Sequence, residues 1–116
     1  MAQMDVELLS SVVDEYVADR AVRVSPAERS EMIRIAQADP CKRSASAAGV
    51  AYETTRARRK RIYRKCGVTG AAELTSALLR VSLVRLRREG LLPAADVRRA
   101  AAATGSAGDG VPRLLH

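Results

Sequence analysis

The chain has 116 residues, a formal net charge of +7 and 47% apolar residues, but no Trp or Phe and three Tyr. This length predicts one small domain with short appendages, and the Ala- and Leu-rich composition without strand-like alternation predicts an all-α fold. No apolar run is long enough to span a bilayer, and the N-terminus lacks the layout of a signal peptide. We therefore expect a cytoplasmic protein without a membrane partner.

Residues that usually carry catalysis or bind metals are scarce. Cys41, Cys66 and the lone His116 have no metal-ligand spacing, and no Gly-rich phosphate loop or Ser/His/Asp arrangement occurs. We therefore expect no enzyme activity, no metal and no cofactor. The thiols are expected to be reduced, with Cys66 as a small core residue.

The first expected helix covers residues 4–18, within an N-terminal segment 1–23. Asp5 and Glu7 lie in its first turn, where the helix dipole favours acids. Apolar residues recur along one side of it, namely Met4, Leu8, Val12, Val13, Tyr16 and Val17. Such a helix can pack on its own domain or on a second copy of the chain, and the sequence does not decide between them.

A second helix is expected over about 26–38. Ser25 can cap it, Pro26 fits the first helical position and Glu28 completes a capping box. Asp39-Pro40 ends it, because the residue before a proline leaves the α region. Its buried stripe is expected to comprise Met32, Ile35 and Ala36, with Ile33 close by. A short helix over about 41–48 follows and ends at Gly49, in the place of a C-cap glycine.

The next stretch, residues 50–68, holds seven basic residues and one acid, and so carries a formal +6 of the total +7. We expect a helix over 52–65 whose inward face carries Thr55, Ile62 and Cys66. Its outward face is expected to carry Glu53, Arg56, Ala57, Lys60, Arg61 and Arg64. Such concentrated charge predicts a polyanionic partner, most commonly nucleic acid. A solvated basic helix without a ligand is the alternative on composition alone.

Two short helices joined by a turn with Gly49 are typical of a helix-turn-helix, whose second helix enters the DNA major groove. Arg56 and Lys60 lie one turn apart on the outward face, and Arg can bind guanine O6 and N7 with two parallel bonds. Flanking cations are expected to reach phosphates, namely Arg58, Arg61, Arg64 and Lys65. Glu53 either accepts from a cytosine amino group or is simply a carboxylate at a helix start.

A fourth helix of this domain is expected over about 71–89, closed by Gly90. It is longer than one small domain needs, and its apolar residues include Leu74, Leu78, Val81 and the cluster Leu83, Val84 and Leu86. A short Ala-rich helix over about 94–103 and a flexible tail are expected to follow. The expected division is therefore an N-terminal helix in 1–23, a helix-turn-helix domain in 24–90 and an appendage in 91–116.

Residues 24–80 resemble the LuxR/GerE-type helix-turn-helix of bacterial transcription regulators, and residues 54–74 are the most specific part. Four pieces carry the likeness in the expected order: Ser25-Pro26-Ala27-Glu28-Arg29, then Ile35-Ala36-Gln37, then Gly49-Val50, and last Thr54-x-Arg56 to Ile62-Tyr63-Arg64-Lys65-x-Gly67-Val68 followed by Ala72-Glu73-Leu74. The resemblance implies a four-helix DNA-binding domain whose third helix reads the major groove. It also implies that the fourth helix supplies a dimer contact, expected at Leu74, Leu78 and Val81.

By the same resemblance, the base-reading positions fall on Arg56, Ala57 and Lys60, and Lys42 and Thr54 match positions that usually contact phosphate. The expected partners are double-stranded DNA, a second copy of the chain, and RNA polymerase or another regulator. The segment ahead of the helix-turn-helix is too short for a receiver or ligand-binding domain, so we expect a stand-alone DNA-binding domain.

Several residues depart from the family pattern. Polar residues stand at sites that are usually apolar, namely Glu31, Ser44 and Arg59, while Ala48 replaces a Leu and Arg58 a His. Ala51 stands where a capping Ser is common, at a cost of about 0.5–2 kcal/mol. Arg59 lies only about 40° from the inward stripe, so it must snorkel or find a partner.

The sequence favours a sequence-specific DNA-binding transcription regulator that acts as a homodimer. A second hypothesis is an anti-activator, which would use the same fold to sequester another regulator or an RNA polymerase subunit. Ser44, Arg59 and the long helix 71–89 motivate it. A third, an RNA-binding or sequence-blind DNA-coating protein, is supported by charge alone, and the scarcity of aromatic residues argues against it.

Overall fold

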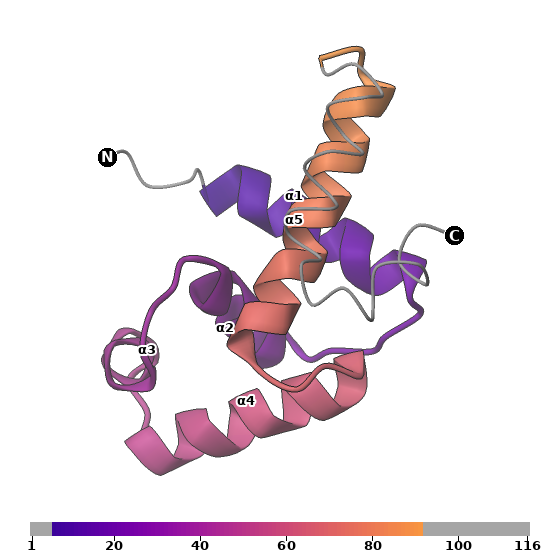
Figure 1. Ribbon diagram of the computed structural model, residues 1–116. Helices are drawn as coiled ribbons and strands as arrows, with labels where there is room; N and C mark the ends of the chain where they lie inside the picture. The colour runs from indigo at the N-terminus through magenta and orange to yellow at the C-terminus, as the bar shows by residue number, and fades with distance from the viewer. Residues whose placement is uncertain (1–5, 92–116) are drawn as a thin grey trace. The chain divides into compact units, whose positions relative to one another are not determined.

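The computed structural model describes residues 6–91, which form five helices and no strand (Figure 1). The helices are α1 (Val6–Asp19), α2 (Pro26–Ala36), α3 (Cys41–Ala48), α4 (Tyr52–Cys66) and α5 (Ala71–Arg88). The prediction of an all-α fold is confirmed. The expected Ala-rich helix over 94–103, the tail and Met4 lie outside the described residues.

The ends of the helices follow from local chemistry. At the start of α2, the Glu28 amide donates to Ser25 Oγ (3.1 Å) and the Ser25 amide donates to Glu28 Oε1 (2.9 Å), which is the predicted capping box. Gly49 and Gly67 end α3 and α4 in the left-handed conformation, with φ of 70° and 69°.

The C-terminal end of α2 differs slightly from the prediction, because the helix stops at Ala36 rather than near Ala38. Ala38 adopts φ 64°, its amide donates to the Ile35 carbonyl (2.9 Å), and the Asp39 amide donates to the Arg34 carbonyl (3.0 Å). This is the hydrogen-bond pattern of a Schellman motif, in which glycine is the usual left-handed residue.

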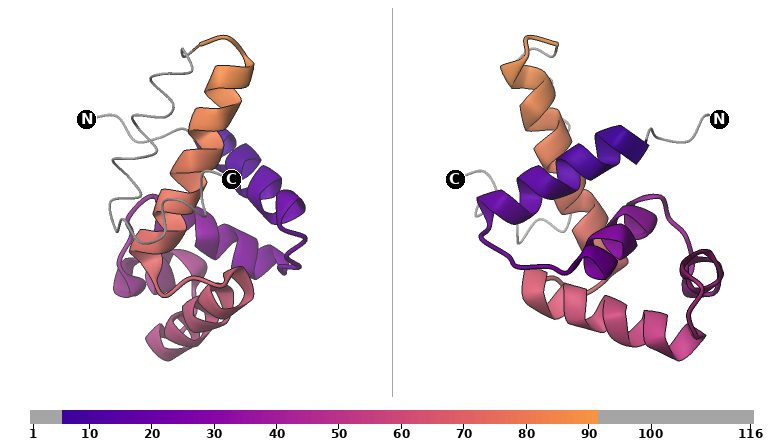
Figure 2. Two further views of the ribbon diagram at one scale, coloured as in Figure 1. Left: turned by 45° about the vertical axis from the view of Figure 1, so that its right-hand side comes forward. Right: turned by 180° about the vertical axis from the view of Figure 1, so that it is seen from behind.

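The chain divides into two compact units, residues 1–75 and 76–116, and the division falls inside α5. In the first unit α2 packs against both α1 and α4, and α3 packs against α4 (Figures 1 and 2). An ion pair between Arg29 Nε and Asp14 Oδ1 (2.7 Å) also links α2 to α1. The expected division into 1–23, 24–90 and 91–116 stays a prediction.

The buried face of α1 is the predicted one in its middle but not at its ends, where Val17 is only half-buried and Leu8 is exposed. Val12, Val13 and Tyr16 are buried as expected, but Leu8 is 44% exposed and Leu9 is 4% exposed. Leu9 precedes the other three by three, four and seven residues, which places it in the middle of the stripe, whereas Leu8 lies at its edge. The prediction for Leu8 was therefore wrong by one position.

The remaining core of the first unit comes from α2, α3, α4 and the start of α5. In α2, Met32, Ile33 and Ile35 are buried as expected, but Ala36 is only half-buried. Fully buried polar residues accompany them, and Glu28, Glu31 and Ser44 are each at most 2% exposed. Within residues 6–91, no helix is both long and apolar enough to cross a membrane.

Candidate nucleic-acid interface

Helix α4 has one face in the core and one face in solvent. Thr55 and Ile62 are fully buried and Cys66 is 5% exposed, which confirms the predicted inward stripe. The predicted outward residues are all exposed, namely Glu53, Arg56, Ala57, Lys60, Arg61 and Arg64. Helices α3 and α4 each end at a glycine and are joined by a short turn, and α4 is the basic helix of the two. This is the helix-turn-helix arrangement that the sequence predicts.

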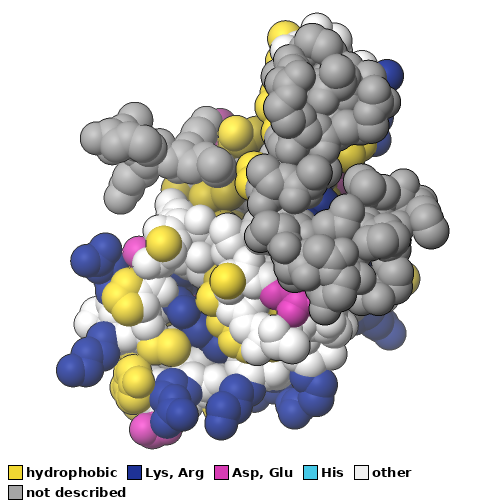
Figure 3. Space-filling view, viewed as in Figure 1, with side chains coloured by type: hydrophobic (Ala, Val, Ile, Leu, Met, Phe, Trp, Pro, Cys, Tyr) yellow, Lys and Arg dark blue, Asp and Glu magenta, His cyan; other side chains and the backbone are white. Residues whose placement is uncertain are grey.

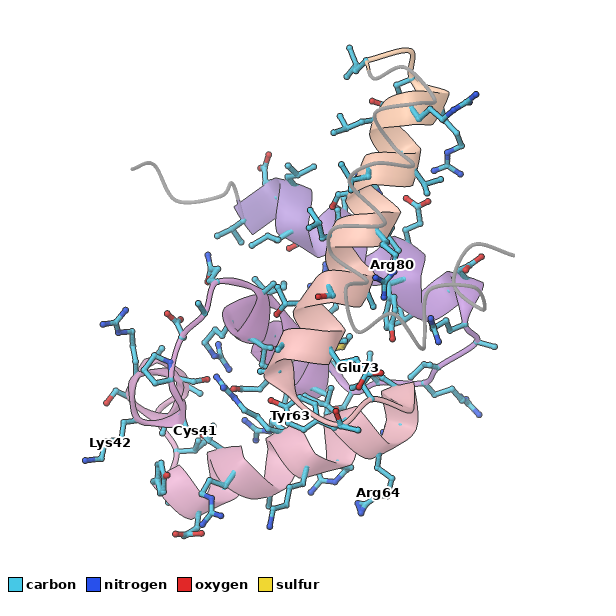
Figure 4. The ribbon with its side chains drawn as sticks, viewed as in Figure 1. Cys41, Lys42, Tyr63, Arg64, Glu73 and Arg80 are labelled. Carbon is cyan, nitrogen blue, oxygen red and sulfur yellow. The ribbon has the colours of Figure 1, made fainter. Side chains whose placement is uncertain are left out.

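The exposed face of α4 is strongly cationic. In Figure 3, Lys and Arg side chains gather along the edge of the first unit over α4, and others lie beside α3. Lys42 points outward from α3 and Arg64 points outward from α4 (Figure 4). The predicted phosphate contact Thr54 is also exposed, whereas Arg58 is half-buried.

Some of these cations have no acidic partner among residues 6–91, namely Lys42, Arg58, Lys60 and Arg64. The three predicted base contacts, Arg56, Ala57 and Lys60, lie on the same exposed face as Arg64. A surface of unpaired cations that follows one helix attracts a polyanion most strongly along that helix. This part of the predicted site is therefore brought together and open to solvent.

Two of the predicted phosphate contacts are engaged by an acid of α2. Lys65 Nζ lies 2.8 Å from Glu28 Oε1 and 3.0 Å from the Arg23 carbonyl oxygen, and Arg61 Nη1 lies 3.5 Å from Glu28 Oε2. Burial raises the pKa of Glu28, but hydrogen bonds from Lys65 and the Ser25 amide outweigh it and leave the pKa below its ordinary value. The sequence indicated Glu28 as a capping residue but not as the partner of these cations.

The first turn of α4 carries a smaller cluster. Arg56 Nη1 lies 3.5 Å from Glu53 Oε1, and the Arg56 guanidinium carbon lies 5.9 Å from the centre of the Tyr52 ring. All three side chains are exposed. The guanidinium that is expected to read a base thus has a carboxylate and an aromatic ring beside it at the surface.

Three polar residues at sites that were expected to be apolar, Glu31, Ser44 and Arg59, meet in one buried cluster. Arg59 Nε lies 2.6 Å from Glu31 Oε2, and the Ser44 hydroxyl lies 2.6 Å from the Glu31 carboxylate oxygens. Arg34 Nη2 donates to Glu31 Oε1 (3.0 Å), and Arg59 Nη2 donates to the Asp39 carbonyl (2.7 Å). Arg59 therefore finds the partner that its place near the inward stripe requires.

This cluster joins α2, α3 and α4, and its hydrogen bonds favour the charged form of Glu31. Burial raises the pKa of Glu31, but hydrogen bonds from Ser44, Arg59 and Arg34 outweigh it, so the pKa lies below its ordinary value. The side chains of Glu31 and Arg59 are 0% and 9% exposed, so both charges sit away from bulk water. The cluster holds the basic helix to its scaffold.

The predicted dimer contacts differ in accessibility. Leu74 is fully buried and Leu78 is 3% exposed, so neither offers much surface to a second chain, whereas Val81 is half-buried. The exposed large apolar residues of α5 are Leu79 and Val84, at 39% and 47%. A dimer through this helix stays a prediction.

Comparisons of the chain with family models, curated proteins and solved structures found no match. Across residues 6–91, no group of three His, Cys, Asp or Glu side chains is placed to hold a metal ion.

Proposed function

We propose that the protein is a sequence-specific DNA-binding transcription regulator that places α4 in the major groove, as the resemblance to LuxR/GerE-type regulators implies. The observation that carries this proposal is the division of α4 into a buried face and an exposed cationic face. A helix with this division, as the second helix of a helix-turn-helix, suits the width of the major groove of B-form DNA.

The roles of the side chains follow from their accessibility. Arg56 and Lys60 are exposed and one turn apart, so both can reach base edges from one docked helix. Lys42 and Arg64 are exposed and have no acidic partner among residues 6–91, and they supply phosphate contacts from α3 and from the far end of α4. Arg61 and Lys65 contribute less than their charge suggests, because Glu28 already neutralises part of it.

The anti-activator hypothesis loses part of its motivation. Ser44 and Arg59 suggested a surface adapted to another protein, but both are satisfied inside the chain by Glu31. The length of α5 remains in its favour, and so does the exposure of Val84. We retain it as an outcome of the experiment below.

The experiment is a titration of the full chain with duplex DNA at several salt concentrations, using sequences selected from a random pool. Arg56→Ala is expected to weaken binding to the selected sequence by about 1–3 kcal/mol and to relax the preference at one base pair. Arg64→Ala is expected to weaken selected and random duplexes alike and to lower the salt slope by about 1. Arg87→Ala, which removes an exposed charge from the last turn of α5, is the charge-matched control.

Two results would contradict the proposal. The first is unchanged binding in both α4 variants, which would exclude docking through this face. The second is no selected sequence at all, together with a stable complex with another protein on size exclusion, which would favour the anti-activator. The homodimer is tested separately by light scattering, where a concentration-independent mass of 12.5 kDa would exclude it.

A further inference from the structure

Glu53 is the one acid within α4, and it stands on the face proposed to meet a polyanion. Its side chain is 77% exposed, and its hydrogen-bond partner among the described residues is Arg56 rather than a backbone amide at the helix start. A carboxylate that approaches DNA is repelled by the phosphates unless it meets a hydrogen-bond donor. If Glu53 approaches DNA at this position, its carboxylate therefore needs a hydrogen-bond donor on a base.

The major groove offers such donors only on particular bases. Cytosine presents its N4 amino group and adenine its N6 amino group, whereas guanine presents the acceptors N7 and O6. Along the edge of a G·C pair the order is acceptor, acceptor, donor, and along an A·T pair it is acceptor, donor, acceptor. A guanidinium beside a carboxylate presents two donors and then an acceptor. This order complements the G·C pair. It conflicts with the A·T pair at the middle group, where donor meets donor, and at the last group, where acceptor meets acceptor.

The distances agree with this order. Arg56 Nη1 and Glu53 Oε1 are 3.5 Å apart. Guanine O6 and cytosine N4 are hydrogen-bonded to each other across the base pair, and such partners lie about 2.9 Å apart. The two side chains can therefore contact neighbouring atoms of one base pair without first separating. The Tyr52 ring lies 5.9 Å from the guanidinium, which is within the range of a cation–π contact.

We propose that Glu53 and Arg56 read a single G·C base pair together, with Arg56 donating to guanine O6 and N7 and Glu53 accepting from cytosine N4. This inference rests on the proposed function and adds the identity of one base pair in the target. It also gives Glu53 a role in specificity. The charge of its carboxylate lowers affinity for every duplex, because the phosphates repel it, and the hydrogen bond to cytosine N4 offsets this repulsion at the G·C pair.

The experiment is a selection of duplexes from a random pool, followed by binding measurements, for the full chain and its Glu53→Gln variant. The wild-type chain is expected to select a G·C pair at one position. Glu53→Gln is expected to reduce discrimination at that position by about 5- to 150-fold, since a well-made base contact is worth that factor. Arg56→Ala is expected to affect the same position, and the double variant little more than either single one.

Asp19→Asn is the matched control, because it removes one exposed acid from the end of α1. Both variants gain one unit of positive charge, so a uniform rise in affinity is common to them, but only Glu53→Gln is expected to change a base preference. An unchanged preference in Glu53→Gln would overturn the inference while leaving the proposed function intact, and Glu53 would then be a helix-start carboxylate. A wild-type chain that selects no sequence would instead contradict the proposed function itself.

Discussion

Replacing Arg59 with leucine tests whether the buried polar cluster supports the fold. The change removes the cation closest to Glu31, whose carboxylate is 0% exposed and lies 2.6 Å from Arg59 Nε. Removing one partner of a buried ion pair costs about 3–5 kcal/mol, because the other charge is left in a poorly solvated place. Here Glu31 keeps Arg34 at 3.0 Å and Ser44 at 2.6 Å, which favours the lower end of that range.

We therefore expect Arg59→Leu to lower the free energy of unfolding by about 3 kcal/mol, a large part of the total for a small domain. The corresponding fall in Tm is more than about 10 °C. Urea and thermal unfolding followed by far-UV circular dichroism measure both quantities. Arg64→Leu makes the same substitution at an exposed position of the same helix, and it is expected to change stability by less than about 0.5 kcal/mol.

The double variant Glu31→Leu/Arg59→Leu separates a missing partner from a general intolerance of leucine in α4. With both charges gone, no carboxylate is left short of a cation, so the double variant is expected to be more stable than Arg59→Leu alone. If Arg59→Leu were as stable as the wild-type chain, the reasoning about the cluster would be refuted.

Three further changes have expected outcomes that unfolding measurements can check. Ala51 is the N-cap of α4 with extended φ and ψ and no side-chain cap bond, so Ala51→Ser is expected to stabilise the fold by about 0.5–2 kcal/mol, and an unchanged urea midpoint would count against it. The Thr55 hydroxyl is buried without a partner among the described residues, so Thr55→Val is expected to raise the thermal midpoint rather than lower it. The carboxyl groups of Glu28 and Glu31 have lowered pKa values, so the unfolded chain binds protons more readily than the folded chain. The contribution of these two groups to the free energy of unfolding is therefore expected to be complete above the unfolded-state pKa and to be lost as the pH drops below about 5. The loss is expected to be less steep in Glu31→Gln. A free energy of unfolding that increases on acidification would contradict this.

Local signals in the sequence were sufficient to predict the helices. Ser25, Pro26 and Glu28 mark the start of α2, and Gly49 and Gly67 mark the ends of α3 and α4. Each of these signals acts within a few residues, so no knowledge of tertiary contacts was needed. The two faces of α4 were also predictable, because helical periodicity alone separates them.

Contacts between helices were harder to predict, because they depend on how separate elements pack. Arg59 and Glu31 are 28 residues apart, and the pairing of Lys65 with Glu28 spans 37. A signal did exist for the first pairing: polar residues stand at three normally apolar sites, Glu31, Ser44 and Arg59. Polar side chains forced toward one core have to satisfy each other. The joint occurrence of these three was therefore a signal for one cluster, but the predictions from the sequence did not include it.

The network around Glu31 also limits how α4 can rotate about its own axis. Apolar side chains in contact can slide past one another with little change in energy, whereas a guanidinium fork bonded to a carboxylate and to the Asp39 carbonyl tolerates little angular change. Arg59 is three residues after Arg56 and one before Lys60, so a rotation of the helix would carry all three together. The direction in which Arg56 and Lys60 face solvent is thus fixed by the buried contacts of Arg59.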